Sequence, residues 1–124
     1  MKPLNDLTVL VLENDFGVGL QLMRALSDEG CRGVKLVRTV EAALRELAAA
    51  TPDAATLDLD VRGKPPSLVA NALAAHDVPL VIISSRSVGV LGTSHPRLAV
   101  CQKPVAIREV VSLLTNAITQ REGV

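Results

Sequence analysis

The stretch Ala54–Gly63 reads AATLDLDVRG, in which a short apolar run leads directly into two aspartates. The run is small and apolar apart from one threonine, which is typical of a strand buried within a parallel sheet. Asp58 and Asp60 follow it, separated by one leucine. Two carboxylates at the end of a buried strand are costly unless a cation or a reaction uses their charge. The stretch therefore predicts a buried strand with a functional site at its end.

Apolar runs and helical patterns alternate along the rest of the chain. The apolar runs predict strands at residues 7–12, 33–37, 54–59, 78–84 and 97–102. Helical spacing of apolar residues predicts helices at residues 18–30, 38–50, 67–76 and 106–119. Thr39 and Ser67 are the expected N-caps of two of these helices, and Gly30 is an expected helix stop.

Residues 85–96 are the weak point of this alternation. Their sequence, SRSVGVLGTSHP, stands where a further helix belongs, but its two glycines, β-branched residues and proline predict a short or irregular one. Because apolar strands alternate with helices, we expect an α/β fold with a parallel sheet covered on both faces. The length suits one hydrophobic core, so we expect residues 1–124 to form a single domain.

The composition argues against several classes of function. Phe16 is the only aromatic residue, so the chain offers no platform for stacking nucleic-acid bases. Thirteen basic and thirteen acidic residues balance, and no basic run indicates binding to nucleic acid or an anionic membrane. Neither a signal peptide nor a stretch of ~20 apolar residues is present, so we expect a cytoplasmic protein. Cys31 and Cys101 lack metal-site spacing, and Cys101 is expected in the core.

Polar side chains follow four of the five predicted strands. In an open parallel α/β sheet, ligands bind at the carboxyl ends of the strands, so we expect these residues to converge on one rim. Each also has a purely structural interpretation, since Ser84 can be a turn residue, Lys103 a solvated strand end and Asp15 a helix cap. The residues are Glu13, Asn14, Asp15, Asp58, Asp60, Ser84, Lys103 and Pro104.

The chain resembles the receiver domain of two-component response regulators over nearly its whole length. VLVLEND resembles the first strand and acidic cluster of that family, and PDAATLDLDVRG resembles its phosphoacceptor strand. VPLVIISS resembles the fourth strand with its terminal hydroxyl, and CQKPV resembles the Lys-Pro motif. The resemblance implies a flavodoxin-like, doubly wound (βα)5 fold with a five-stranded parallel sheet of order 2-1-3-4-5.

The resemblance also implies roles for the residues at the rim. Asp58 would accept a phosphoryl group, Lys103 would pair with a phosphoryl oxygen, and the Ser84 hydroxyl would donate a hydrogen bond to another. Mg²⁺ would neutralise the negative charges of the Asp58 carboxylate and the incoming phosphoryl group. Its implied ligands are Glu13 or Asn14, the Asp58 carboxylate and the backbone carbonyl of Asp60, with Asp15 acting through a water and the Lys103-Pro104 peptide in the cis form.

The same resemblance implies partners. A sensor histidine kinase or phosphotransfer protein would supply the phosphoryl group, and a downstream protein would sense the change. The sequence leaves undecided whether the chain forms a homodimer. Direct binding to nucleic acid or membrane is not expected. Beyond accepting and losing its own phosphoryl group, the chain would not act as an enzyme.

Four positions depart from the family pattern. Asn14 replaces an acidic metal ligand, so we expect weak Mg²⁺ binding. Val100 and Val105 stand where receivers often carry aromatic residues, so the usual aromatic switch is absent. An acid at Asp60 would repel a phosphoryl group on Asp58, and we favour an orientation in which its side chain points to solvent.

Two other interpretations compete with a phosphorylated receiver. The first is a pseudo-receiver that keeps the fold as a phosphorylation-independent interaction module, which Asn14 and the missing aromatic residue favour. The second is a small α/β enzyme or flavin carrier, for which Ser84, His95 and Asp58 would make a hydrolytic triad. The missing glycine-rich phosphate loop and nucleophile elbow argue against the second.

Overall fold

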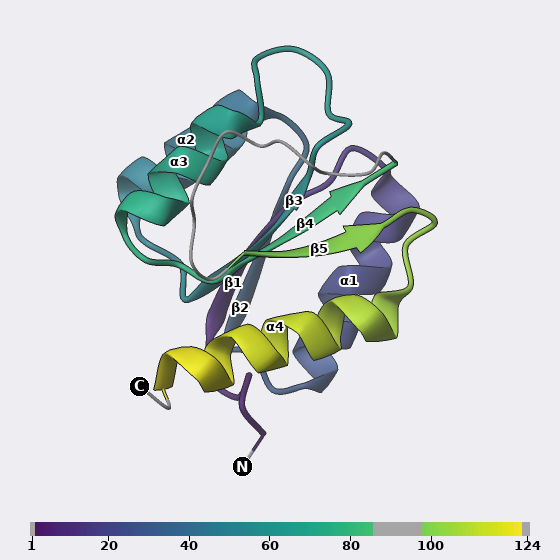
Figure 1. Cartoon of the computed structure of the whole chain (residues 1–124), viewed down its shortest axis with the longest axis vertical. Helices are drawn as coiled ribbons and strands as arrows, with labels where there is room; N and C mark the ends of the chain where they lie inside the picture. The colour runs from purple at the N-terminus through teal and green to yellow at the C-terminus, as the bar shows by residue number, and fades with distance from the viewer. Residues whose placement is uncertain (1, 86–97, 123–124) are drawn as a thin grey trace.

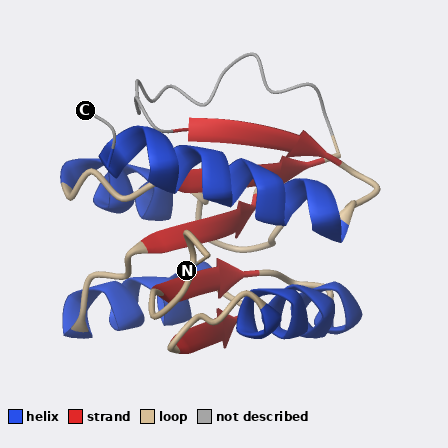
Figure 2. Ribbon diagram, turned by 90° about the horizontal axis from the view of Figure 1, so that it is seen from below, coloured by secondary structure: helices blue, strands red, loops and turns tan. Residues whose placement is uncertain are grey.

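Five short strands form one parallel sheet in the computed structural model, which describes residues 2–85 and 98–122. The strand order is β2-β1-β3-β4-β5, as the resemblance to receiver domains predicts. Figure 2 shows the strand arrows pointing the same way, with helices on both sides of the sheet. The strands are β1 (Thr8–Leu12), β2 (Gly33–Val37), β3 (Ala54–Asp58), β4 (Leu80–Ser84) and β5 (Leu98–Gln102).

Four helices in the described part of the chain cover the two faces of the sheet (Figure 1). α1 and α4 pack on one face, where their leucines contact apolar residues of β1, β3 and β4. α2 and α3 pack on the other face. All five residues of β3 and of β4 are buried, because helices cover these central strands on both sides. The helices are α1 (Phe16–Asp28), α2 (Val40–Ala49), α3 (Ser67–Ala75) and α4 (Ile107–Glu122).

The helix ends follow the local sequence at most of the predicted positions. The Thr39 hydroxyl caps α2 by accepting from the backbone N–H of Ala42 at 3.1 Å, as predicted. Gly30 follows α1 with a φ of +91°, a left-handed conformation that favours glycine, so the predicted stop is also confirmed.

The prediction that Ser67 caps a helix is wrong. Pro66 is the N-cap residue of α3, and no side chain accepts a capping hydrogen bond there. The Pro65-Pro66 pair starts the helix instead, because the carbonyls of both prolines accept the first helical N–H groups, from Leu68 and Val69. Apart from Ser85, the predicted irregular helix at residues 85–96 lies outside the described residues.

The chain order of the sheet brings β1 and β3 side by side at its centre. Leu12 pairs with Leu57, so β1 and β3 end at nearly the same level. The Asp58 position pairs with Ile83, which sets the end of β4 beside them. Residues that follow these strands therefore share one rim of the sheet. Cys101 of β5 is buried in the α1–α4 layer, which confirms its prediction as a core thiol. None of the helices in the described ranges has the length and apolar character needed to cross a membrane.

Candidate functional site

Asp58 is the last residue of β3, and its side chain is almost completely buried at 1% exposure. Its Oδ1 accepts the backbone N–H of Asp60 at 2.9 Å and lies 3.1 Å from the Lys103 ammonium. Its Oδ2 faces the backbone N–H of Asn14 at 3.5 Å, a distance typical of a weak hydrogen bond. The buried carboxylate is thus held by donors from three different segments of the chain.

Lys103 links the ends of β4 and β5 to this carboxylate. Its backbone N–H donates to the Ser84 carbonyl at 2.8 Å, which extends the pairing of the two strands by one residue. Its ammonium lies 3.1 Å from Asp58 Oδ1 and 3.0 Å from Asp60 Oδ2. The Lys103-Pro104 peptide is cis, as the resemblance implies.

The electrostatic environment keeps the Lys103 side chain charged. Partial burial lowers the pKa of Lys103, but hydrogen bonds with Asp60 and Asp58 and the charges of both carboxylates outweigh it. The net effect raises the pKa of Lys103 above its ordinary value. A permanent positive charge therefore stands beside the Asp58 carboxylate.

The Asp60 side chain is partly exposed but contacts other groups of the rim, so the favoured expectation that it faces only solvent is wrong. Its Oδ2 accepts the backbone N–H of Ser85 at 3.0 Å as well as contacting Lys103. Burial raises the pKa of Asp60, but the hydrogen bonds from Lys103 and Ser85 outweigh it and lower the pKa below its ordinary value. The reason is the chain path: the Leu59 N–H pairs with the Ile83 carbonyl at 2.9 Å, and the following turn brings Asp60 over the rim.

Glu13 directly follows β1 and is buried to 1% exposure. Its Oε2 accepts the backbone N–H of Asp15 at 3.0 Å, whereas Oε1 has no hydrogen-bond partner among the described residues. Burial, together with the hydrogen bond and the charge of the neighbouring Asp58 side chain, raises the pKa of Glu13 from its ordinary value to about 7. Glu13 and Asp58 therefore form a carboxyl pair in which Glu13 binds a proton near neutral pH.

The other two residues after β1 contribute differently. Asp15 caps α1 by accepting the Val18 N–H at 3.1 Å, so its structural interpretation is confirmed. Asn14 meets its neighbours through its backbone: the N–H faces Asp58, and the carbonyl accepts from Arg38 Nη2 at 3.3 Å. Arg38 was missed in the sequence. It directly follows β2, so the rule that placed the other residues would have found it if applied to that strand.

Ser84 lies at the same rim, as predicted. It is the last residue of β4, is 3% exposed, and stands one residue beyond the level at which β3 ends. Asp58, Ser84 and Lys103 are therefore brought together by the ends of β3, β4 and β5. His95, the third member of the hydrolytic triad drawn from the sequence, lies outside the described residues.

The comparisons with known proteins bear on the fold. No family model matches the chain, and no curated protein matches its sequence. A response regulator receiver protein from Sinorhizobium medicae WSM419 matches with a TM-score of 0.82 and 19% identity, over 93% of this chain and 96% of that one. The BeF3-activated receiver domain of nitrogen regulatory protein C matches with a TM-score of 0.77 and 23% identity, over 98% and 99%. SdrG from Sphingomonas melonis Fr1 matches with a TM-score of 0.68 and 29% identity, over 95% and 98%.

The chain has the fold of a response-regulator receiver domain. The receiver fold confirms the predicted flavodoxin-like architecture and strand order. Asp58 lies at the carboxyl end of the third strand of this fold. At identities this low, the comparisons establish the fold alone.

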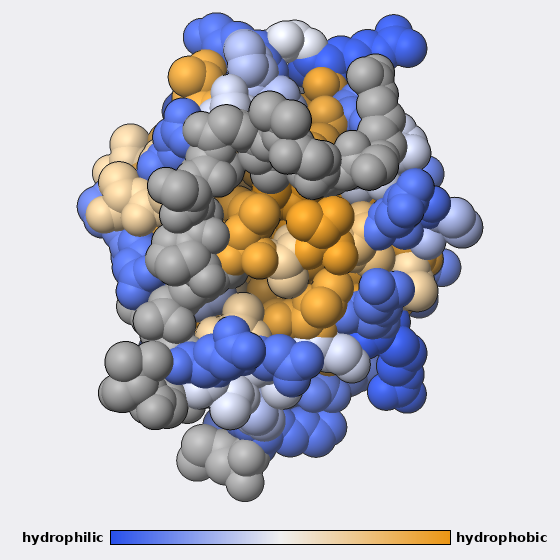
Figure 3. All heavy atoms as spheres, viewed as in Figure 1, coloured by the Kyte–Doolittle hydropathy of each residue, from blue (hydrophilic) through white to orange (hydrophobic). Residues whose placement is uncertain are grey.

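The outer strand of this receiver fold exposes apolar side chains in place of an aromatic residue. Val100 of β5 is 41% exposed, and Leu98 and Ala99 beside it are partly buried. Figure 3 shows apolar surface over this edge of the sheet. Val105 packs against the α1–α4 layer. The valines predicted to replace the aromatic switch therefore lie in different environments, one exposed and one against the core.

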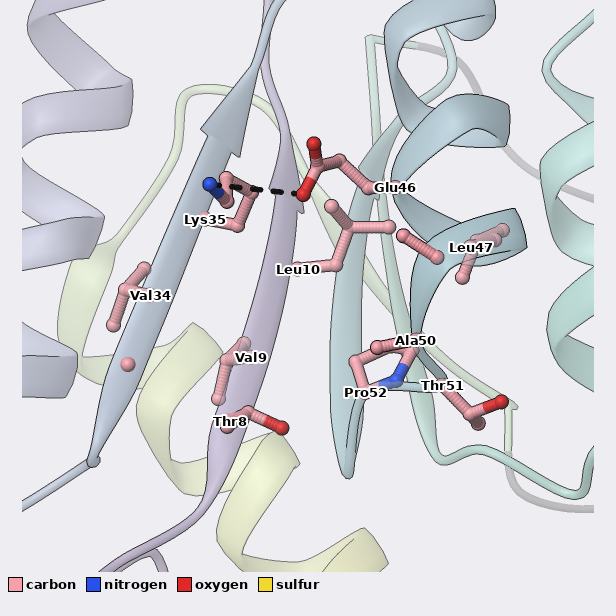
Figure 4. Close-up of a pocket in the computed structure, with 12 residues that line it drawn as sticks. Thr8, Val9, Leu10, Val34, Lys35, Glu46, Leu47, Ala50, Thr51 and Pro52 are labelled. Carbon is pink, nitrogen blue, oxygen red and sulfur yellow. Dashed lines mark ion pairs between the residues drawn. The ribbon is translucent and has the colours of Figure 1, made fainter.

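A hollow of about 380 Å³ lies at the other end of the receiver fold (Figure 4). It opens between the first halves of β1 and β2 and the end of α2. Lys35 and Glu46 face each other across it at 3.7 Å, and Thr8 donates its N–H and hydroxyl to Asp53. The two charged residues that line the hollow are thus paired with each other, and the hollow is separate from Asp58 at the opposite rim.

Proposed function

We propose that this chain is a phosphoryl-accepting receiver of two-component signalling, with Asp58 as the acceptor. The observation that carries the proposal is the buried Asp58 carboxylate, held 3.1 Å from the Lys103 ammonium where the ends of three strands meet. A nucleophilic carboxylate needs a fixed position and a nearby positive charge to meet an anionic phosphoryl donor. Both requirements are met here by residues of the described chain.

The reaction transfers a phosphoryl group from a phospho-histidine to Asp58. A carboxylate oxygen of Asp58 attacks phosphorus, and the bond between phosphorus and the histidine nitrogen breaks. The electron pair of that bond leaves with the imidazole, and an acyl phosphate remains on Asp58. Lys103 balances charge on the phosphoryl oxygens as a compact cation. Ser84, at the adjacent strand end, would donate its hydroxyl to one of these oxygens.

Mg²⁺ is part of this proposal, and the site offers few charged ligands for it. The buried Glu13 Oε1 lacks a protein partner among the described residues and belongs to the carboxyl pair with Asp58. No three acidic, histidine or cysteine side chains of the described residues form a cluster that could hold a metal. The remaining ligands would be the Asp60 carbonyl, Asn14 and water. Because the Asn14 amide is neutral, we expect weak binding.

The proposed partners follow from the chemistry of the site. A sensor histidine kinase or a phosphotransfer protein supplies the phospho-histidine, and a downstream protein responds to the phosphorylated form. The chain would act on no other substrate. With valine at positions 100 and 105, its response would not use an inward-swinging aromatic side chain.

Treatment with acetyl phosphate and Mg²⁺ tests the proposal, with intact-mass spectrometry as the measurement. We expect one phosphoryl adduct on the wild-type chain, and none on Asp58→Ala. Asp28→Ala, which removes an exposed carboxylate at the far end of α1, is the matched control and keeps the adduct. An adduct that persists in Asp58→Ala contradicts the assignment.

A pseudo-receiver is the second candidate, and one observation favours it. The Lys103 ammonium already contacts two carboxylates, those of Asp58 and Asp60, before any phosphoryl group is present. A chain committed to this state would bind its partners without phosphorylation. The absence of an adduct from wild type, at saturating acetyl phosphate and Mg²⁺, would favour this candidate over the first.

A further inference from the structure

The Asp60 carboxylate binds donors that are suited to a phosphoryl group. Its Oδ2 accepts from the Lys103 ammonium and from the Ser85 backbone N–H, each at 3.0 Å. An ammonium and a backbone N–H at a strand end are common ligands of phosphate oxygens, and they bind carboxylate oxygens by the same charge-assisted hydrogen bonds. Asp60 therefore holds, as an anion, two groups that an incoming anion needs.

The two donors bound by Asp60 lie next to Asp58, where a phosphoryl group on Asp58 would also need them. The same ammonium lies 3.1 Å from Asp58 Oδ1, so it bridges the two carboxylates. Ser85 directly follows Ser84, at the end of the strand that neighbours β3. A phosphoryl group bonded to Asp58 would place its oxygens beside these donors, and close to a like charge on Asp60.

We propose that Asp60 is a built-in competitor of the phosphoryl group, holding the Lys103 and Ser85 donors until phosphorylation of Asp58 displaces it. This inference rests on the proposed function. It makes Asp60 a positioning residue that restrains the resting site, and it provides a movement that phosphorylation would cause. The Asp60 side chain is 30% exposed, so it has a path outward to water when it is displaced.

A role in stability alone explains the contact less well. An ion pair between partly exposed side chains contributes little to folding, because solvent screens it. The ion pair does oppose phosphorylation, because Lys103 must break its contact with Asp60 before it can bind the phosphoryl oxygens. Asp60→Asn removes this cost with little change in shape, because the amide is neutral and similar in size.

The first measurement is the affinity of the chain for beryllofluoride, a phosphoryl mimic, in the presence of Mg²⁺. We expect Asp60→Asn to bind it about tenfold more tightly than wild type, and to react with acetyl phosphate faster by a similar factor, since one charge-assisted hydrogen bond is released. Glu41→Gln is the comparison. It removes an exposed carboxylate from the first turn of α2, the helix that follows β2, and this carboxylate is not among the contacts of Lys103.

The second measurement follows the contact directly by NMR. In the resting wild-type chain, the Ser85 amide proton should show the downfield shift of a hydrogen bond to a carboxylate, and Asp60→Asn should reduce it. Adding beryllofluoride and Mg²⁺ to wild type should move both the Ser85 amide and the Asp60 carboxyl carbon resonances. A purely structural role for Asp60 would leave its carboxyl resonance unmoved by beryllofluoride.

The outcomes separate failure of this inference from failure of the proposed function. If wild type and Asp60→Asn bind beryllofluoride and form the adduct equally well, Asp58 phosphorylation stands and the competitor role is overturned. A gain in Glu41→Gln equal to that in Asp60→Asn also overturns it, because the effect is then one of general charge. If neither chain forms an adduct, the proposed function fails and the inference fails with it. An adduct that appears only in Asp60→Asn supports the competitor role of Asp60, and it favours the pseudo-receiver as the function of the wild-type chain.

Discussion

Glu13 is the residue whose pKa responds most clearly to the crowding of carboxylates at the site. It is as deeply buried as Asp58, it belongs to the same carboxyl pair, and one of its oxygens has no partner among the described residues. The Lys103 ammonium forms ion pairs with Asp58 and Asp60 and not with Glu13. The Glu13 carboxyl group is therefore neutralised by a proton. The pKa of Glu13 is accordingly raised from 4.5 to about 7 by burial and by Asp58.

This raised pKa predicts a pH dependence of stability in metal-free buffer. Glu13 ionises near pH 4.5 in the unfolded chain but only near pH 7 in the folded one, so the folded state holds the proton more tightly. Stability is therefore lost as the pH rises between these values, by on the order of 3 kcal/mol at the upper end. Glu13→Gln cannot ionise, so this part of the pH dependence should disappear.

Urea unfolding followed by circular dichroism checks this prediction. The free energy of unfolding of wild type, relative to Glu13→Gln, should fall as the pH rises from about 4.5 to about 7. A difference between the two chains that stays constant over this range would show that Glu13 ionises normally in the folded state.

At the scale of the elements, three glycines differ in backbone conformation and in the space around them. Gly30 follows α1 with a φ of +91°, and a Cβ built on it would clash with Asn5 Oδ1. Gly63, in the loop before α3, also has a positive φ, of +95°, but a Cβ there would meet nothing within 4 Å. Gly33 opens β2, and a Cβ on it would be 3.9 Å from the nearest atom.

These three glycines allow the backbone and steric contributions to be measured separately. Gly63→Ala should cost about 1 kcal/mol of stability, because alanine strains a left-handed backbone. Gly30→Ala should cost more than Gly63→Ala, because it adds the clash with Asn5. Gly33→Ala should be neutral or slightly stabilising, since strands disfavour glycine. Thermal unfolding of the three variants gives the order, and equal losses in Gly30→Ala and Gly33→Ala would contradict it.

At the scale of the whole molecule, the sequence predicted the architecture and the rim better than the contacts within the site. Apolar runs of strand length, each followed by a helical pattern, are enough to indicate a parallel sheet, and the strand-end rule then brings Asp58, Ser84 and Lys103 together. These inferences succeed because they depend on periodicity and on chain order.

The wrong and missed predictions concern contacts made by turns. Asp60 was expected to face solvent, because its spacing from Asp58 says nothing about the turn that brings it to Lys103 and Ser85. Arg38 was missed because the strand-end rule was not applied to the predicted strand at residues 33–37, which Arg38 directly follows. Ser67 carries a common N-cap side chain, yet the two prolines before it set the start of α3.

The most direct test of the account is to locate the phosphoryl group. An acyl phosphate on aspartate is reduced by borohydride to homoserine, so treatment with acetyl phosphate and Mg²⁺, then borohydride, followed by peptide mass spectrometry, identifies the residue that carried it. We predict homoserine at position 58 alone, with more of it in Asp60→Asn than in wild type. Homoserine at position 60 or at another carboxylate, with position 58 unmodified, would contradict the account.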